Sequence, residues 1–402
     1  IHMISIGIDA AKGKSTICIL KPYGEVVVPP RDISHTASEL DSLIFLIKSL
    51  GEPVKAVMES TGTYHYPILH ALVDADIFAA VENPLVIKKY ISSNIRKGKT
   101  DKLDAIKLAQ YGLEKWLILK RYEPQEVTYS ELKLLGRQYT NYIGMRVAAL
   151  NQFSDLLDQT MPGIDRLLKS NSANKAKCKA CDFAEAFWHF DLITKRSEKS
   201  FIATYNAWAK KKGYRPSESK AKEIYALAKD GTPTLSSSMP STKMLILESI
   251  RLLNTANLTL RTILSQMHLL ASELPEYSIV SAMKGVGSQL SVLLIAEIGD
   301  VRRFHNGSAL VAYAGLDAPP FQSGTFYGTK RHISKRGSSQ LRKLCFEVMM
   351  ALKLKPPKED AAVYDFMLKK EAEGKPKMVA KVAAMNKFLR IYYARVLESY
   401  SA

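Results

Sequence analysis

The N-terminal part of the chain alternates short apolar runs with amphipathic segments. Ile4, Ile6 and Ile8 alternate with more polar residues, and this period of two predicts a strand with one buried face. Further strands are expected over 15–20, 25–28, 54–59 and 77–81, and helices over 37–50, 66–73 and 100–115. The resulting order, β-β-β-α-β-α-β-α, predicts an α/β domain over residues 3–122.

Beyond about residue 124 the pattern changes to long helical periodicity. Residues 126–158 and 242–274 each predict one long helix, and together they indicate an antiparallel coiled-coil arm or a bundle over 123–275. Between them, about 165–240, we expect an irregular Lys-rich insert that ends in a Ser-rich linker. Residues 276–400 are predicted to be a mostly α C-terminal domain, interrupted by one Gly-rich basic loop.

The charge of the chain indicates a polyanionic partner. Lys and Arg number 57 against 39 Asp and Glu, a net charge of +18 in 402 residues. Nucleic acid is the expected partner, because such a surplus neutralises phosphates, and an anionic membrane surface is the alternative. No apolar run approaches the ~20 residues that span a bilayer, so we expect no membrane span and a cytoplasmic location.

Cysteine is sparse. Cys18, Cys178, Cys181 and Cys345 are too few for a disulfide framework and suit a reducing compartment. Cys178 and Cys181 form one CxxC motif, which we interpret as two ordinary cysteines in a Lys-rich loop. The alternative is a zinc site, for which His189 is the nearby additional ligand.

Four carboxylates fall at positions where an acidic site can form. Asp9 ends the first predicted strand and Glu59 ends the fourth. The order of elements is that of the RNase H fold, in which these two strands are neighbours, so the two side chains should converge. Asp101 and Asp104 are three residues apart on a predicted helix and share a face, roughly 5–6 Å apart.

These carboxylates predict a divalent-metal site. Singly, each has an ordinary explanation: a turn residue, a strand end in solvent, or the first turn of a helix capped by Thr100. Together they would repel one another unless cations lay between them, and oxygen ligands suit Mg²⁺ or Mn²⁺. Nearby cations indicate a track for a nucleic-acid backbone rather than only a solvated face: Lys88, Lys89, Arg96, Lys97, Lys99 and Lys102.

Two C-terminal signals also favour nucleic acid. The segment with Gly285 and Gly287, followed by an apolar run, is typical of a helix-hairpin-helix, although a plain glycine turn between packed helices gives the same pattern. Ser323 lies between flexible neighbours and close to the cations Lys330, Arg331, Lys335 and Arg336. Its hydroxyl could attack a phosphodiester; the alternatives are a phosphate-binding loop without covalent chemistry or a plain surface loop.

Several of these motifs, in this order, resemble a known family, the DEDD-type insertion-sequence transposases (IS110 family), now described as bridge-RNA-guided recombinases. The more specific stretches are 99–105 (KTDKLDA) and 334–337 (SKRG). The other matching stretches are 7–9 (GID), 58–62 (MESTG), 285–287 (GVG), 314–316 (AGL) and 322–324 (QSG). Residues 160–240 carry no matching motif.

The resemblance implies a RuvC-like N-terminal domain, a coiled-coil arm and a C-terminal serine domain. It implies Asp9, Glu59, Asp101 and Asp104 as ligands of Mg²⁺, with Mn²⁺ as a substitute, and Ser323 as a nucleophile that links transiently to DNA. Ser334, Ser338 and Ser339 are the competing serines. It also implies a homodimer or homotetramer, double-stranded donor and target DNA, and a structured noncoding guide RNA that pairs with both DNAs.

Two other functions fit the same residues. A RuvC-like nuclease or junction resolvase would use water as the nucleophile and would need the four carboxylates but not Ser323. A non-enzymatic nucleic-acid-binding protein would need only the basic surface. Metal-dependent nicking and a covalent protein–DNA adduct distinguish the three possibilities.

Overall fold

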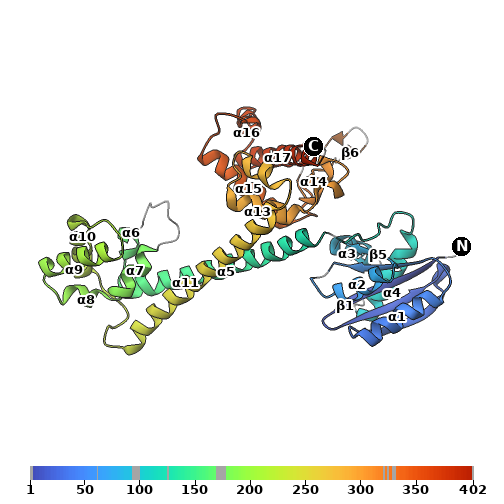
Figure 1. The fold of residues 1–402 in the computed structure, drawn as a ribbon, viewed down its shortest axis with the longest axis horizontal. Coiled ribbons are helices and arrows are strands. Elements are labelled where there is room, and N and C mark those ends of the chain that lie inside the picture. Colours follow the sequence, from blue (N-terminus) through green and yellow to red (C-terminus); the bar gives the residue numbers. More distant parts are fainter. Residues whose placement is uncertain are drawn as a thin grey trace. The chain divides into compact units, whose positions relative to one another are not determined.

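The computed structural model describes residues 3–60, 62–92, 100–124, 126–168, 178–319, 322–323, 326–327 and 332–400. The chain divides into two compact units, Ile1–Pro124 and Gln125–Ala402 (Figure 1). Each unit has its own hydrophobic core or cores, and each is described separately below.

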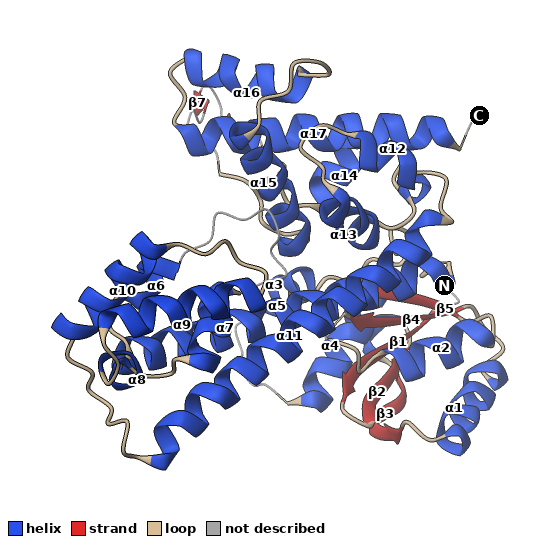
Figure 2. Ribbon diagram, turned by 60° about the vertical axis from the view of Figure 1, so that its left-hand side comes forward, coloured by secondary structure: helices blue, strands red, loops and turns tan. Residues whose placement is uncertain are grey.

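The first unit is built on one mixed sheet (Figure 2). Its strands are β1 Ile4–Ala11, β2 Lys14–Leu20, β3 Val26–Ser34, β4 Val54–Glu59 and β5 Phe78–Glu82. Their order is β3-β2-β1-β4-β5; β1, β2 and β3 are antiparallel, whereas β4 and β5 run parallel to β1. These are the order and directions of an RNase H-like sheet, which confirms the predicted α/β domain.

Helices cover both faces of this sheet. The apolar face of β1 packs with α1 Ala37–Ser49 and α2 Tyr66–Asp74 in one core, which contains Ile4, Ile6 and Ile8. The other face carries α4 Asp101–Glu114. A further helix, α3 Pro84–Ser92, was not predicted from the sequence. Leu85 and Val86 are exposed on it and only Ile87 is buried, so it has no continuous apolar stripe.

A two-helix arm forms the first part of the second unit. The helices α5 Val127–Thr160 and α11 Pro240–Ser272 lie side by side, as the coiled-coil prediction expected (Figure 1). Between them the described residues form five helices around an aromatic core, so the expectation of an irregular insert is wrong. They are α6 Ile164–Leu168, α7 Lys179–Ala186, α8 Phe190–Thr194, α9 Glu198–Lys211 and α10 Glu218–Asp230. The helices have 5 to 14 residues, too short for clear periodicity, and they are held by buried Phe183, Phe201 and Tyr205.

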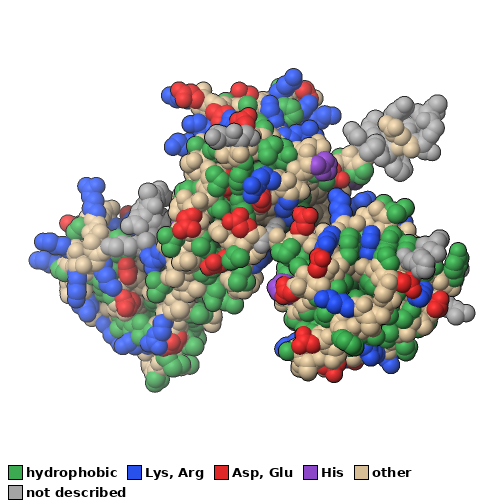
Figure 3. Space-filling view, turned by 45° about the vertical axis from the view of Figure 1, so that its right-hand side comes forward, with side chains coloured by type: hydrophobic (Ala, Val, Ile, Leu, Met, Phe, Trp, Pro, Cys, Tyr) green, Lys and Arg blue, Asp and Glu red, His purple; other side chains and the backbone are tan. Residues whose placement is uncertain are grey.

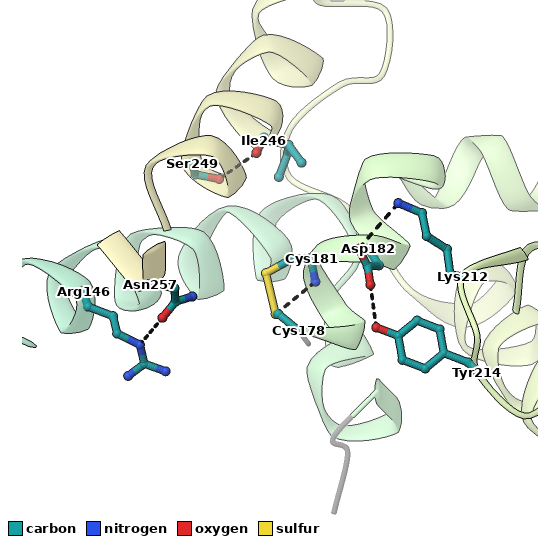
Figure 4. Close-up of a disulfide and its surroundings, with 9 residues drawn as sticks. All are labelled: Arg146, Cys178, Cys181, Asp182, Lys212, Tyr214, Ile246, Ser249 and Asn257. Atoms are coloured by element: carbon teal, nitrogen blue, oxygen red, sulfur yellow. Dashed lines mark hydrogen bonds and ion pairs between the residues drawn. A yellow bond between two sulfur atoms is a disulfide. The ribbon is translucent and has the colours of Figure 1, made fainter. Parts of the chain in front are cut away.

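The CxxC motif at the start of α7 forms a disulfide (Figure 4). Cys178 is the N-cap residue, and its Sγ accepts a hydrogen bond of 3.2 Å from the Cys181 backbone N–H, so the two sulfurs meet on the first turn. The interpretation as two unlinked cysteines is therefore wrong. The zinc alternative fails as well, because His189 caps α8: its Nδ1 accepts from the Asp191 N–H and its Nε2 bonds the Leu235 carbonyl.

The second unit ends in a helical domain that shares a core with the base of the arm. Its elements are α12 Tyr277–Ala282, α13 Ser288–Ile298, α14 Gly307–Tyr313, β6 Gln322–Ser323, β7 Phe326–Tyr327, α15 Ser339–Leu354, α16 Ala362–Ala372 and α17 Lys377–Ser399. Helix α13 is buried along most of its length, next to Leu132 of α5 and Met267 of α11. Among the helices described, none is both long and apolar enough to span a membrane.

A buried carboxylate joins the arm to the last helix. Glu276 is 1% exposed and accepts hydrogen bonds from the Tyr129 hydroxyl (2.7 Å) and the Tyr400 hydroxyl (2.8 Å). Burial raises the pKa of Tyr129 above its usual range, and the hydrogen bonds of its hydroxyl with Tyr400 and Glu276 raise it further. Glu276→Ala leaves both hydroxyls without this acceptor and should lower the free energy of unfolding by about 3 kcal/mol. Urea unfolding of the full chain measures it; a midpoint equal to that of the unmodified protein would contradict this role.

Candidate active site

The position of α4 is set by a direct contact between its backbone and β1. A Cβ added to Gly7 would lie 2.0 Å from the Ala105 carbonyl oxygen and 2.3 Å from the Ala109 nitrogen. Further along the helix, a Cβ on Gly112 would lie 2.0 Å from the Ser5 Oγ. Glycine is therefore required on both elements, and α4 runs antiparallel to β1 on this face.

This arrangement carries the first turn of α4 to the end of β1 that holds Asp9. Ser5 lies at the level of Gly112, and Gly7 lies at the level of Ala105 and Ala109. Asp9 is the next residue on the same face, because side chains two apart along a strand share a face. The first turn of α4, with Asp101 and Asp104, is therefore directed toward Asp9.

Glu59 ends the neighbouring strand on the same face. β1 and β4 pair in parallel as far as Ile8 and Met58, so Asp9 and Glu59 follow the last paired residues of the two strands. Val57 packs in one cluster with Leu108 and Tyr111 of α4, and Glu59 lies two residues further on that face. The structure thus brings the four predicted carboxylates to one end of one face of the sheet.

Local capping and charge stabilise the acidic first turn. The Thr100 Oγ1 accepts a hydrogen bond of 3.2 Å from the Leu103 N–H, as the predicted N-cap requires. The pKa of Lys14, at the start of β2, is raised chiefly by its hydrogen bond to Asp32 and also by the charge of Asp101. Asp101 is therefore close enough to act electrostatically on the turn between β1 and β2.

The donor set fits a hard divalent cation, but the carboxylates are not yet gathered around one point. Within the described parts of the chain, no group of three or more His, Cys, Asp or Glu side chains is arranged to hold a metal ion. All four predicted ligands supply carboxylate oxygens, the donors that Mg²⁺ and Mn²⁺ prefer. Asp9, Glu59, Asp101 and Asp104 are the residues that would hold such an ion.

The sequence interpretation missed one acidic residue at this end of the sheet. Glu82 is the register partner of Glu59 on β5, and burial raises the pKa of its carboxyl group. Ala80, two residues earlier, packs in the cluster that contains Val57 and Tyr111. The signal was available, since Glu82 is the last residue of its strand just as Glu59 is.

Of the predicted basic track, Lys102 is exposed on α4, whereas Lys97 and Lys99 lie outside the described residues.

The glycine turn of the C-terminal domain connects α12 to α13. A Cβ on Gly285 would lie 2.7 Å from Leu352 Cγ of α15, and its φ is +79°, so this glycine serves close packing. Gly287 is the N-cap residue of α13, and no other group lies within 4 Å of an added Cβ there. The two helices and the connecting glycine turn of the predicted helix-hairpin-helix are present, and phosphate contact at these two glycines stays a prediction.

The backbone of Ser323 lies in a short hairpin that is clamped at its base. β6 and β7 pair with Ser323 opposite Phe326. At the base, the Ser334 N–H donates to the Asp317 carbonyl (2.7 Å) and the Ser334 Oγ donates to the Asp317 carboxylate (2.5 Å). The side chain of Ser323 lies outside the described residues, as do Lys330 and Arg331.

The segment after the hairpin is held against α14. The Lys335 N–H donates to the Gly315 carbonyl at 3.1 Å, and Lys335 has a φ of 53°, in the left-handed region. A Cβ on Gly337 would lie 2.0 Å from the Tyr313 carbonyl oxygen, so only glycine fits there. Lys335 and Arg336 are exposed on this segment.

Two of the competing serines have structural partners. The Ser334 hydroxyl is bonded to Asp317. The Ser338 Oγ donates to buried Glu297 at 2.5 Å and accepts from the Leu341 N–H at 3.0 Å, so it caps α15. Glu297 also pairs with Arg137 of α5 at 2.9 Å, which ties this cap to the arm.

Comparisons with known proteins found matching family models, relatives and solved structures. Residues 6–162 match a family model described as a transposase (DEDD_Tnp_IS110), and residues 277–365 match the transposase IS116/IS110/IS902 family. The chain is 23% identical over 345 residues to the pilin gene-inverting proteins of Moraxella bovis and Moraxella lacunata, covering 85% of this chain and 80% of each relative. Thermus thermophilus RuvC, alone and with a Holliday junction substrate, matches at 10% identity over 30% of this chain and all of that chain, with a TM-score of 0.24.

These matches define the class of the protein as a transposase or recombinase, an enzyme that cuts DNA and transfers strands. The first family model covers the RNase H-like unit, and the second covers part of the C-terminal domain. Both models describe transposases. Within that class, the chain belongs to the IS110 family of transposases.

Proposed function

We propose that this transposase cuts and rejoins donor and target DNA with two sets of residues. Asp9, Glu59, Asp101 and Asp104 hold Mg²⁺, or Mn²⁺ in its place, and Ser323 is the nucleophile. The observation that carries the first set is the backbone contact of α4 with Gly7, which directs the first turn of α4 toward the strand ends bearing Asp9 and Glu59.

The four carboxylates would hold the ion that stabilises the reacting phosphate. When bound, a divalent ion supplies positive charge to the phosphate oxygens and to the leaving oxygen. The residues position it: Asp9 and Glu59 from a rigid sheet, and Asp101 and Asp104 from a helix that cannot shift against β1 without breaking the contact at Gly7. This rigidity favours a fixed geometry for the reaction.

Ser323 supplies the covalent step. Its Oγ loses a proton and attacks phosphorus, a serine O–P bond forms, and the bond from phosphorus to one DNA oxygen breaks, releasing a DNA hydroxyl. A DNA hydroxyl then attacks the same phosphorus and restores the phosphodiester and the serine. Exposed Lys335 and Arg336 offset the negative charge that develops on the phosphate.

The proposed nucleic-acid and protein partners are inferred from the net charge of the chain and from its family. Double-stranded donor and target DNA are the substrates, and the net charge of +18 supports backbone binding. The resemblance adds two further elements to the proposal, a structured noncoding guide RNA that reads sequence by pairing and a homodimer or homotetramer as the working assembly.

Cleavage of a labelled insertion-element end, with its guide RNA and Mg²⁺, tests the metal site. The double variant Asp101→Asn/Asp104→Asn should lower the cleavage rate by on the order of 10³-fold, because the loss of two ligands removes several kcal/mol of charge stabilisation. EDTA should have the same effect on the unmodified protein.

A matched control carries the same substitution on the opposite face of the sheet. Asp41 and Asp74 are exposed on α1 and α2, so Asp41→Asn/Asp74→Asn should cleave at the normal rate. Equal cleavage by both double variants would refute the assignment. Metal-dependent cleavage without any covalent protein–DNA adduct would instead identify a hydrolytic nuclease.

A further inference from the structure

The last two helices carry a concentration of lysines that the catalytic proposal does not use. Residues 374–397 contain no acidic residue but four lysines and two arginines. We define the lysine surface as Lys369, Lys375, Lys377, Lys381 and Lys387, on α16, α17 and the turn between them. Lys and Arg side chains gather over this part of the second unit (Figure 3). Helix α17 lies beyond residues 277–365, which match the family.

The acidic residues nearest to this surface are already paired. Glu371 is bonded to Lys353 of α15 (2.5 Å), and Glu373 is bonded to Lys370 (2.7 Å). The pKa of Glu373 is lowered first by Lys370 and further by the charges of Lys369 and Lys375, so several lysines surround one carboxylate. Among the described residues, the five members of the lysine surface form no ion pair.

Aromatic rings, rather than carboxylates, position two of these lysines. Lys381 Nζ lies 5.2 Å from the ring centroid of Phe346 and 3.4 Å from Met350 Sδ, both on α15. Lys387 Nζ lies 4.9 Å from the centroid of Phe366 on α16. A ring face orients an ammonium group without neutralising it, so these N–H donors keep their charge for another anion.

The lysine surface and the glycine turn at residues 283–287 both contact α15. Gly285 packs on Leu352, and the next residue, Lys353, bonds Glu371 of α16. The pKa of Asp360, between α15 and α16, is lowered chiefly by Arg395 and also by Lys284 of that turn. The glycine turn, where phosphate contact is predicted, and the lysine surface therefore pack on the same helix.

We propose that the lysine surface binds the phosphate backbone of double-stranded DNA, an inference that rests on the proposed action on DNA. Five uncompensated cations spread over two helices and their connecting turn suit an extended polyanion, and the enzyme acts on DNA. Met378 and Val379 are also exposed there, 56% and 51%, so an anionic lipid surface is an outcome that the test must be able to reveal.

The test measures binding of the full chain to a short random-sequence duplex, in EDTA, over a series of KCl concentrations. Lys375→Gln/Lys377→Gln/Lys381→Gln should reduce the slope of log K against log[KCl] by about 3, because each lost phosphate contact removes about one released counterion. The triple Lys→Arg variant at the same positions should keep the original slope, since the charges remain. Because no metal is present, the result does not depend on the proposed catalytic residues.

The control triple variant, Lys195→Gln/Lys199→Gln/Lys210→Gln, removes three exposed lysines from the helices between α5 and α11 and should leave the slope unchanged. An unchanged slope in the first variant, or an equal reduction in both, would overturn the proposal. The proposal would also be overturned if the lysine variant lost binding only to a structured RNA hairpin or only to phosphatidylglycerol vesicles. Matching thermal unfolding curves establish that both variants are folded.

Discussion

Ser323→Ala should abolish both the covalent protein–DNA adduct and strand joining, lowering the rate by on the order of 10⁴-fold or more. No neighbouring group replaces a deleted nucleophile, and the two-step reaction cannot conserve the energy of the broken phosphodiester without the serine link. The measurement is the yield of recombined DNA and of labelled adduct after denaturation, with guide RNA and Mg²⁺ present. Duplex binding should be unchanged, because the side chain carries no charge.

The neighbouring serines provide matched controls with different expected results. Ser334→Ala removes the hydroxyl that bonds Asp317 at the base of the hairpin, so recombination should slow while the adduct still forms. Ser338→Ala removes the cap of α15 and should cost about 1 kcal/mol of stability, again with the adduct retained. An adduct that persists in Ser323→Ala and disappears in Ser338→Ala would move the nucleophile to the start of α15.

Gly7→Ala should destabilise the RNase H-like unit by about 3 kcal/mol or more. The added methyl group would overlap the backbone of Ala105 and Ala109, and backbone atoms cannot rotate away as a side chain can. The displaced helix carries Asp101 and Asp104, so cleavage should fall as well. Urea unfolding followed by circular dichroism measures the first effect, and the cleavage assay measures the second.

Gly144→Ala is the control for a glycine without such a contact. Gly144 lies inside α5 with nothing within 4 Å of an added Cβ, so alanine should stabilise the helix by roughly 0.5–1 kcal/mol. If Gly7→Ala were as stable as the unmodified protein, α4 would not be held by this contact. The placement of the acidic first turn would then need another cause.

The fold of the first unit could be predicted because its strands are strongly patterned. Ile4, Ile6 and Ile8 define the apolar face, and the predicted strand over 54–59 has the bounds observed for β4. The arm helices were equally clear from their length. The helices between them were missed because each is short and its core is aromatic rather than periodic, with Phe183 and Phe201 fully buried.

The acidic site could be predicted at the level of strand ends and helix faces. Strand order places Asp9 beside Glu59, and helical spacing puts Asp101 on the face of Asp104. The sequence could not show that α4 packs on Gly7 or that Glu82 lies beside Glu59. Both contacts join residues that are far apart in the sequence. The disulfide between Cys178 and Cys181 was also missed. The low cysteine content indicated only a reducing compartment, and it could not show that Cys178 is the N-cap residue of α7, beside Cys181.

The most direct test of the central claim is to locate the DNA-linked residue by mass spectrometry. The full chain is reacted with guide RNA, donor and target DNA and Mg²⁺, denatured, treated with nuclease and digested. A phosphodiester-linked nucleotide on the peptide that contains Ser323, absent from Asp101→Asn/Asp104→Asn, is the result expected. A nucleotide on Ser338 or Ser339, or metal-dependent cleavage without any modified peptide, would contradict the proposed serine mechanism.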